Sequence, residues 1–227
     1  MFLILSLDSY KIKEGGMRRI KKGINKPVRT LSCMKLMIFD LSGVLFSNEE
    51  NEFFPQFCKK YGLKLDEVVP YYNKLIEMAE RNEVTLEYVW AKVFRRFNLN
   101  LDAQATTKEV VRLKQANKPM LEVVRELRKK VKTAYLTNYA KEYWELISKV
   151  FPFQDYFDGG VVSYQVGSRK PEKGCFEAVL KKFGVGVSEC LYIDDSQKNV
   201  KAATAFGIKG LVFRSKDEFL REISGLL

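Results

Sequence analysis

The most constraining feature of this 227-residue sequence is the segment Lys35–Leu45. It begins as an apolar run, reaches Asp40, and continues to Gly43. An apolar run bounded by turn residues is typical of a strand buried on both faces, and open α/β sheets bind ligands at the carboxyl ends of such strands. Gly43 lets the backbone turn sharply and brings main-chain N–H groups toward a ligand. Asp40 is therefore the candidate nucleophile.

The pattern of apolar residues in the second half of the chain predicts a regular alternation of strands and helices. Ser196 is expected to begin one of these helices and Gly207 to end it. Because β-α-β units have right-handed crossovers, this alternation predicts an α/β fold with a Rossmann-like parallel sheet flanked by helices. The expected strands are 131–136, 160–163, 190–193 and 208–213, and the expected helices start near 118, 140, 172, 196 and 216.

Four helical patterns interrupt this alternation between the first strand and residue 116. Ser47 has capping-box spacing to Glu50, and Thr85 precedes the clearest amphipathic stripe. The aromatic residues of these stripes are expected to form a helical core. The helices are also placed to serve as a lid over the strand ends. We therefore predict a core of residues 34–47 and 116–227 with an inserted α-helical cap, 48–115.

Residues 1–33 do not fit a globular element well. They hold eight Lys or Arg and two acidic residues, within a chain of net charge +11. Three interpretations remain open: a flexible tail, an extra edge strand with a linker, or a start codon assigned too early, and we favour a dispensable, flexible extension. Nucleic-acid binding is not expected, because residues 11–30 contain no aromatic residue among the basic ones.

The composition excludes several classes of chemistry. The sequence contains no histidine, which removes His-based acid–base catalysis and Ser-His-Asp triads. Its four cysteines, Cys33, Cys58, Cys175 and Cys190, lack metal-ligand spacing and suggest reduced thiols in a cytoplasmic protein. No apolar run is long enough to cross a membrane. The remaining options are carboxylates, Lys or Arg, hydroxyls, thiols and an oxygen-bound metal.

Polar residues follow several of the predicted strands and belong on one edge of the sheet. They are Asp40, Thr137, Asn138, Lys170, Asp194 and Asp195. A carboxylate can attack phosphorus, and the transferring group needs cations and donors already in place. Lys170 provides the cation and the Thr137 hydroxyl a donor. The three aspartates form an oxygen site suited to Mg²⁺. Each residue alone has an ordinary structural explanation, so the argument depends on their order and placement.

With these four segments identified, residues 34–227 resemble the haloacid dehalogenase superfamily. The matching motifs are Phe39–Val44, Leu136–Asn138, Arg169–Pro171 and Ile193–Asn199, and the helical insertion resembles the C1 cap of subfamily I. The resemblance implies a Mg²⁺-dependent phosphatase with Asp40 as nucleophile. It implies phosphoryl contacts from Thr137, Asn138 and Lys170, and metal ligation by Asp40, the Ser42 carbonyl oxygen, Asp194 and Asp195.

Ser42 departs from the family pattern, because phosphatases of this family usually have Asp two residues after the nucleophile. That carboxylate acts as general acid and base, a contribution typically worth about 10²–10⁴-fold. A serine hydroxyl cannot relay protons in the same way near neutral pH. We therefore expect slow leaving-group protonation and slow hydrolysis of the aspartyl phosphate, while metal binding through the carbonyl is retained.

Three functions remain open at this point. The first is hydrolysis of a small phosphorylated metabolite, and the second is another chemistry of the superfamily, such as dehalogenation or C–P cleavage. C–P cleavage would require an inward-pointing lysine from the cap, for which Lys59, Lys60, Lys64, Lys74 and Lys92 are the candidates. The third is a non-catalytic binding protein. The sequence identifies neither the substrate nor the oligomeric state.

Overall fold

The computed structural model describes residues 34–224, so the interpretations of residues 1–33, including Cys33, lie outside the described part. The strands are β1 Leu36–Phe39, β2 Lys132–Thr137, β3 Gly159–Val162, β4 Cys190–Asp194 and β5 Lys209–Val212. The helices are α1 Glu50–Tyr61, α2 Leu65–Glu80, α3 Leu86–Arg96, α4 Ala103–Arg112, α5 Lys118–Arg128, α6 Lys141–Val150, α7 Ser163–Val166, α8 Lys173–Phe183, α9 Gln197–Phe206 and α10 Lys216–Ser224.

The five strands form one parallel sheet in the order β3-β2-β1-β4-β5. The central strand β1 pairs Phe39 with Tyr135 of β2 on one side and with Ile193 of β4 on the other. The carboxyl ends of these three strands therefore lie side by side, which confirms the predicted Rossmann-like α/β fold. The register also places the residue that follows β1 between the ends of β2 and β4.

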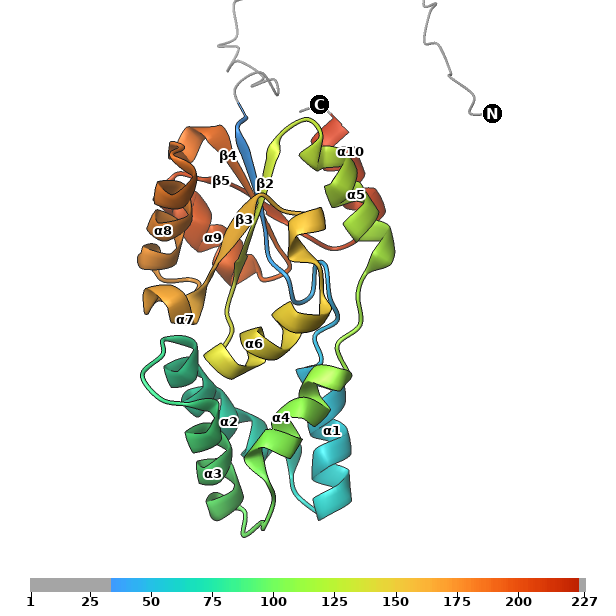
Figure 1. Cartoon of the computed structure of the whole chain (residues 1–227), viewed down its shortest axis with the longest axis vertical. Helices are drawn as coiled ribbons and strands as arrows, with labels where there is room; N and C mark the ends of the chain where they lie inside the picture. Colours follow the sequence, from blue (N-terminus) through green and yellow to red (C-terminus); the bar gives the residue numbers. More distant parts are fainter. Residues whose placement is uncertain (1–33, 225–227) are drawn as a thin grey trace, which may run out of the picture.

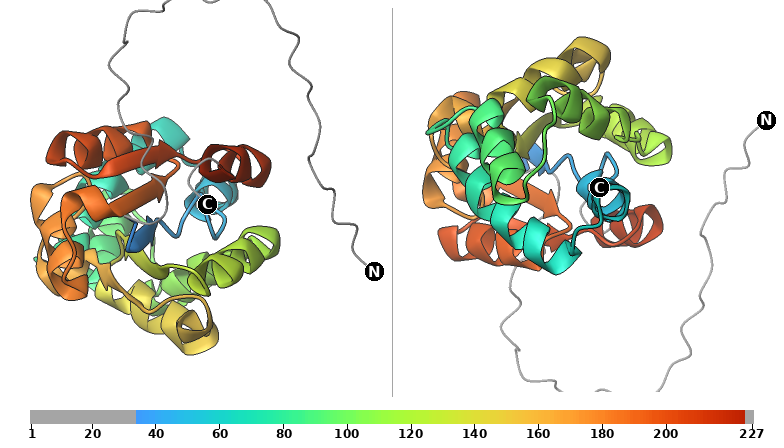
Figure 2. Two further views of the ribbon diagram at one scale, coloured as in Figure 1. Left: turned by 90° about the horizontal axis from the view of Figure 1, so that it is seen from above. Right: turned by 90° about the horizontal axis from the view of Figure 1, so that it is seen from below.

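Successive residues of β1 face opposite helical layers because side chains alternate along a strand. Leu36 and Ile38 pack with residues of α8 and α9, and Met37 and Phe39 pack with residues of α5 and α10. All four are fully buried. Figures 1 and 2 show these helices on the two faces of the sheet. This burial on both faces explains why β1 is an unbroken apolar run rather than an alternating one.

Helices α1–α4 lie at the carboxyl end of the sheet (Figure 1). Their expected aromatic core is confirmed, with Trp90 fully buried against Tyr72 at 5.1 Å between ring centroids. The two connections to the sheet run beside each other, since Ser47 N–H donates to Gln115 O and Asn117 N–H donates to Leu45 O. The inserted helices are thus joined to the sheet through one paired crossing.

One local prediction about α1 is wrong and another about α3 is correct. The expected capping box at Ser47 does not form: Glu49 occupies the N-cap of α1 without a side-chain cap bond. Ser47 Oγ instead accepts the Gln115 N–H, and the Glu49 carboxylate turns to Lys114. Thr85 does cap α3 by accepting the Tyr88 N–H. Ser196 begins α9 and Gly207 ends it, as predicted.

The described cysteines are buried free thiols: Cys58, Cys175 and Cys190. No helix within residues 34–224 combines the length and apolar character needed to cross a bilayer.

Replacing Ile38 with alanine should reduce the free energy of unfolding by about 2–5 kcal/mol, because the side chain is fully buried in the α8/α9 face. Urea denaturation followed by far-UV circular dichroism measures this loss. Leu220→Ala is the matched control on α10, where the side chain is 38% exposed, and it should cost less than about 1 kcal/mol. Equal losses in the two variants would contradict the assigned packing.

Candidate active site

Asp40 lies immediately after β1, at the carboxyl edge of the sheet. Its main-chain N–H donates to Ile193 O, which continues the strand pairing by one residue. Its Oδ1 accepts the Leu41 N–H at 2.6 Å and lies 2.6 Å from the Lys170 Nζ. The residue is buried, with 7% of its surface exposed. A carboxylate in this position is held in one orientation and is already paired with a cation.

Lys170 is buried in the loop between α7 and α8, and its ammonium contacts two carboxylates. The Nζ lies 2.6 Å from Asp40 Oδ1 and 2.9 Å from Asp194 Oδ2. Burial opposes the charge on Lys170, but the two carboxylates outweigh burial and raise its pKa. The ammonium therefore stays charged at neutral pH, as phosphate binding requires.

Asn138 fixes the main chain of that loop. Its Oδ1 accepts the Lys170 N–H at 2.8 Å, and its Nδ2 donates to Lys170 O at 3.1 Å. The amide side chain, for which we predicted a phosphoryl contact, is thus engaged with the loop. Thr137 is buried at the last position of β2. Both residues lie next to the end of β1, as the sequence predicts.

Asp194 is the last residue of β4 and Asp195 follows it, but the two lie in different surroundings. Asp194 is fully buried, and its oxygens accept bonds from Lys170, Tyr192, Asn199 and the Ser196 N–H. Burial alone would raise the pKa of Asp194, but Lys170 and the other donors lower it overall. Asp195 is exposed. The first aspartate is therefore held by the protein, and the second remains accessible.

Gly43 permits the close approach of Asp195. Its φ is +82°, and a Cβ at this position would lie 2.1 Å from Asp195 Oδ2. Any side chain would therefore both strain the backbone and displace the carboxylate. The glycine that the sequence assigns to a turn also leaves space for the acidic group.

Oxygen atoms of Asp40, Asp194 and Asp195 lie within 4.8 Å of one another. Burial raises the pKa of Asp40; Lys170 opposes this rise, and the charges of Asp194 and Asp195 add to it. One ammonium thus faces three carboxylates, and a further cation would offset the remaining repulsion. Hard oxygen donors in this arrangement suit Mg²⁺.

Ser42 lies in a network that the sequence analysis missed. Its hydroxyl is 2.6 Å from the Tyr139 hydroxyl, and the Lys114 Nζ donates to Ser42 Oγ at 3.3 Å. Lys114 forms a buried ion pair with Glu49 and lies 5.1 Å from the centre of the Tyr139 ring. No spacing motif links these residues, since Glu49 and Lys114 stand at opposite ends of the helical insertion. Only the paired crossing at residues 45–47 and 115–117 brings them together.

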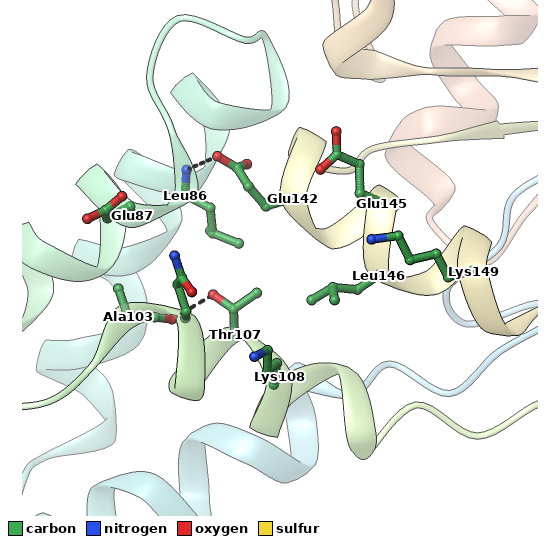
Figure 3. Close-up of a pocket in the computed structure, with 10 residues that line it drawn as sticks. Leu86, Glu87, Ala103, Thr107, Lys108, Glu142, Glu145, Leu146 and Lys149 are labelled. Atoms are coloured by element: carbon green, nitrogen blue, oxygen red, sulfur yellow. Dashed lines mark hydrogen bonds between the residues drawn. The ribbon is translucent and has the colours of Figure 1, made fainter.

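Two cavities differ in their relation to this site. One of about 140 Å³ is lined by Ser42 and Asn138 together with residues of the helical insertion. Another, of about 200 Å³, lies among α3, α4 and α6 and is lined by Leu86, Thr107 and Glu142 (Figure 3). None of the strand-end residues lines the second cavity. The cavity beside Ser42 is therefore the one connected to the candidate site.

Comparison with known families gives one match over most of the chain. The family model described as "haloacid dehalogenase-like hydrolase" matches residues 34–207. The matched range includes Asp40, Lys170, Asp194 and Asp195.

Two curated relatives differ in how much of their length is matched. A sesquiterpene phosphatase of Aspergillus oryzae is 27% identical over 79% of this chain and 90% of its own length. A drimenol cyclase of Aspergillus calidoustus is 24% identical over 85% of this chain. The match covers only 36% of that cyclase.

A solved structure shares the fold. It is an enzyme of the same family from Bacteroides thetaiotaomicron, crystallised as an alanine variant with magnesium and inorganic phosphate. It is 21% identical, covers 81% of this chain and 95% of its own, and gives a TM-score of 0.70. At this identity the likeness establishes the fold.

Replacing Lys170 with methionine should destabilise the metal-free protein by about 3–5 kcal/mol at neutral pH, because Asp40 and Asp194 lose their buried cation. The pKa of Asp194, which Lys170 and the other donors hold below its usual 3.8 against the effect of burial, should then rise. A carboxyl with a raised pKa in the folded state loses stability as pH rises, so the deficit should be larger at pH 8 than at pH 5.

Urea unfolding in EDTA at both pH values measures the deficit. Lys173→Met, whose side chain is 70% exposed in the next helix, is the control and should differ little from wild type. A deficit that does not change with pH would argue against an uncompensated carboxylate.

Proposed function

Since the chain belongs to the haloacid dehalogenase-like hydrolase family, we propose that it hydrolyses small phosphate esters with Mg²⁺ as cofactor and Asp40 as nucleophile. The observation that carries this proposal is the contact of one buried ammonium, Lys170, with Asp40 and Asp194 at 2.6 and 2.9 Å. A nucleophilic carboxylate and the cation that neutralises the transferring group are thus held together at one edge of the sheet.

The donor set at this edge fits the proposed metal. We assign Asp40, Asp195 and the Ser42 carbonyl oxygen as ligands, and Asp194 as a member of the same acidic cluster that also anchors Lys170. Bound Mg²⁺ would neutralise charge on the phosphoryl oxygens. Asp195 is the accessible carboxylate of the three, and Gly43 allows it to lie close to the nucleophile.

The proposed reaction has two displacement steps. Asp40 Oδ attacks phosphorus, the P–O bond to the leaving group breaks, and the departing oxygen takes a proton from water or a nearby group. Water then attacks the aspartyl phosphate, giving inorganic phosphate and free Asp40. Lys170 and Thr137 hold the phosphoryl oxygens in both steps, while Asn138 positions the Lys170 loop. The Gly43 N–H, which the sequence predicts to face the ligand, donates instead to Phe46 O within the turn.

Ser42 is proposed to make both proton transfers slow. It supplies no carboxylate beside the leaving group, and its hydroxyl is bonded within the Tyr139–Lys114–Glu49 network. We expect a working but slow phosphatase rather than a binding protein, because the nucleophile, the cation and the acidic cluster all remain.

The alternatives have less support. The acidic cluster favours a metal-dependent reaction over metal-free dehalogenation. None of the five cap lysines considered for C–P cleavage lines the cavity beside Ser42. Lys59, Lys60, Lys64 and Lys74 are exposed. Lys114 does point inward, but it is paired with Glu49 and does not line that cavity.

Phosphate release from p-nitrophenyl phosphate and acetyl phosphate tests the proposal. Turnover should require Mg²⁺ and stop in EDTA, and Asp40→Asn should lower kcat by at least about 10³-fold because the nucleophile is lost. Asp217→Asn, at an exposed position of α10, is the control and should retain wild-type activity. Persistent activity in Asp40→Asn, or none in wild type, would reject the proposal.

Ser42→Asp should raise kcat by about tenfold or more, since a carboxylate beside the leaving group restores acid–base help. Burst-phase kinetics would show a shorter-lived phosphoenzyme in this variant. The double variant Asp40→Asn/Ser42→Asp should remain inactive, because the gain depends on the same nucleophile. An unchanged or lower kcat in Ser42→Asp would mean that proton transfer at this position does not limit turnover.

A further inference from the structure

The cavity beside Ser42 is polar and small. It has a volume of about 140 Å³, which is the space of about five water molecules. Ser42 and Asn138 lie on its wall, so it adjoins the proposed phosphoryl site. A leaving group attached to the transferred phosphate would therefore extend into this space. The other lining residues are Asn48, Glu49, Glu50, Ile76, Glu80, Tyr139, Ala140 and Tyr143.

Three carboxylates line the cavity, and two of them are already paired. Glu49 pairs with Lys114, and Glu80 Oε2 lies 2.5 Å from Arg169 Nε. Within residues 34–224, no ion pair includes Glu50, which interacts with the Tyr72 hydroxyl. Burial raises the pKa of Glu50 to about 7, and the charges of Glu49 and Glu80 contribute to the rise. Glu50 is thus the carboxyl group available to a ligand.

We propose that the leaving group carries hydrogen-bond donors, hydroxyl or ammonium, within a few atoms of the ester oxygen. The substrate would then be a phosphate monoester of a polyol or an amino alcohol rather than of a plain hydrocarbon alcohol. This inference rests on the proposed phosphatase function. Its physical basis is that a hydrocarbon chain would fill the cavity and leave Glu50 without a ligand partner.

The need for hydrogen-bond donors applies to the atoms near the phosphate and not to the whole leaving group. Asn48 and Glu50 also line a larger cavity of about 710 Å³ between α1 and α2, together with Phe54 and Val69. A bulkier continuation of the leaving group has room there. The inner part of any such molecule would still have to pass Glu50.

Matched short esters test the proposal on the whole chain with Mg²⁺. We would compare kcat/KM for glycerol 3-phosphate, 2-aminoethyl phosphate and n-propyl phosphate, with acetyl phosphate as a reference whose leaving group is only acetate. Wild type should prefer at least one donor-bearing ester over n-propyl phosphate by about 100-fold or more. Glu50→Leu should reduce this ratio to about threefold or less.

A conservative substitution of Glu50 distinguishes hydroxyl donors from an ammonium donor. Glu50→Gln should retain a preference for glycerol 3-phosphate, because an amide oxygen still accepts a hydroxyl bond. It should lose a preference for 2-aminoethyl phosphate, because the negative charge is gone. Glu52→Gln, an exposed glutamate of the same helix, should leave every ratio unchanged.

The ratio of kcat/KM values distinguishes this inference about the leaving group from the proposed phosphatase function. Equal or better turnover of n-propyl phosphate by wild type would overturn the inference while leaving the phosphatase function intact. A ratio that survives in Glu50→Leu would overturn the role of Glu50. No turnover of acetyl phosphate or any ester with Mg²⁺ would overturn the proposed function, and this inference with it.

Discussion

The buried contact between Lys170 and the carboxylates of Asp40 and Asp194 determines how the strand ends can be arranged. The ammonium offsets part of the cost of burying these two carboxylates, since isolated buried charges are costly. The lysine is in turn held by Asn138, which bonds both main-chain groups of Lys170. The ends of β1, β2 and β4 are thereby joined through one side chain, and the proposed chemistry uses the same charges that keep this edge of the sheet together.

The loop that carries Lys170 is also tied to the inserted helices. Arg169 pairs with Glu77 and Glu80 of α2, and Glu172 pairs with Arg81 just after that helix. These pairs flank Lys170 on both sides in the sequence. The position of α2 therefore affects the loop that places the cation beside Asp40. The helices contribute to the site through this loop as well as through the walls of the cavity.

Much of the fold and part of the site could be predicted from the sequence, for identifiable physical reasons. Burial on both faces makes β1 continuously apolar, and parallel topology brings Asp40, Asn138 and Asp194 to one edge regardless of their separation in the chain. Lys114 and Glu49 could not be found in this way. Their pairing depends on how two irregular connections cross, which no periodicity records. The capping box expected at Ser47 is wrong for a related reason: the Glu49 carboxylate is drawn to a tertiary partner, and Ser47 accepts a bond from Gln115.

The contacts of Lys114 and Glu49 also change how Ser42 is interpreted. Considered alone, serine at this position is a missing carboxylate. In the structure it adjoins an ammonium that is already balanced by Glu49, so a carboxylate at position 42 would compete with Glu49 for Lys114. Among the described residues 34–224, the neighbouring Glu50 forms no ion pair at the wall of the cavity. Ser42, in place of the usual aspartate, therefore occurs together with a different arrangement of carboxyl groups around the cavity. A carboxyl group is thus available on the inserted helix, at the wall of the cavity, rather than two residues after the nucleophile.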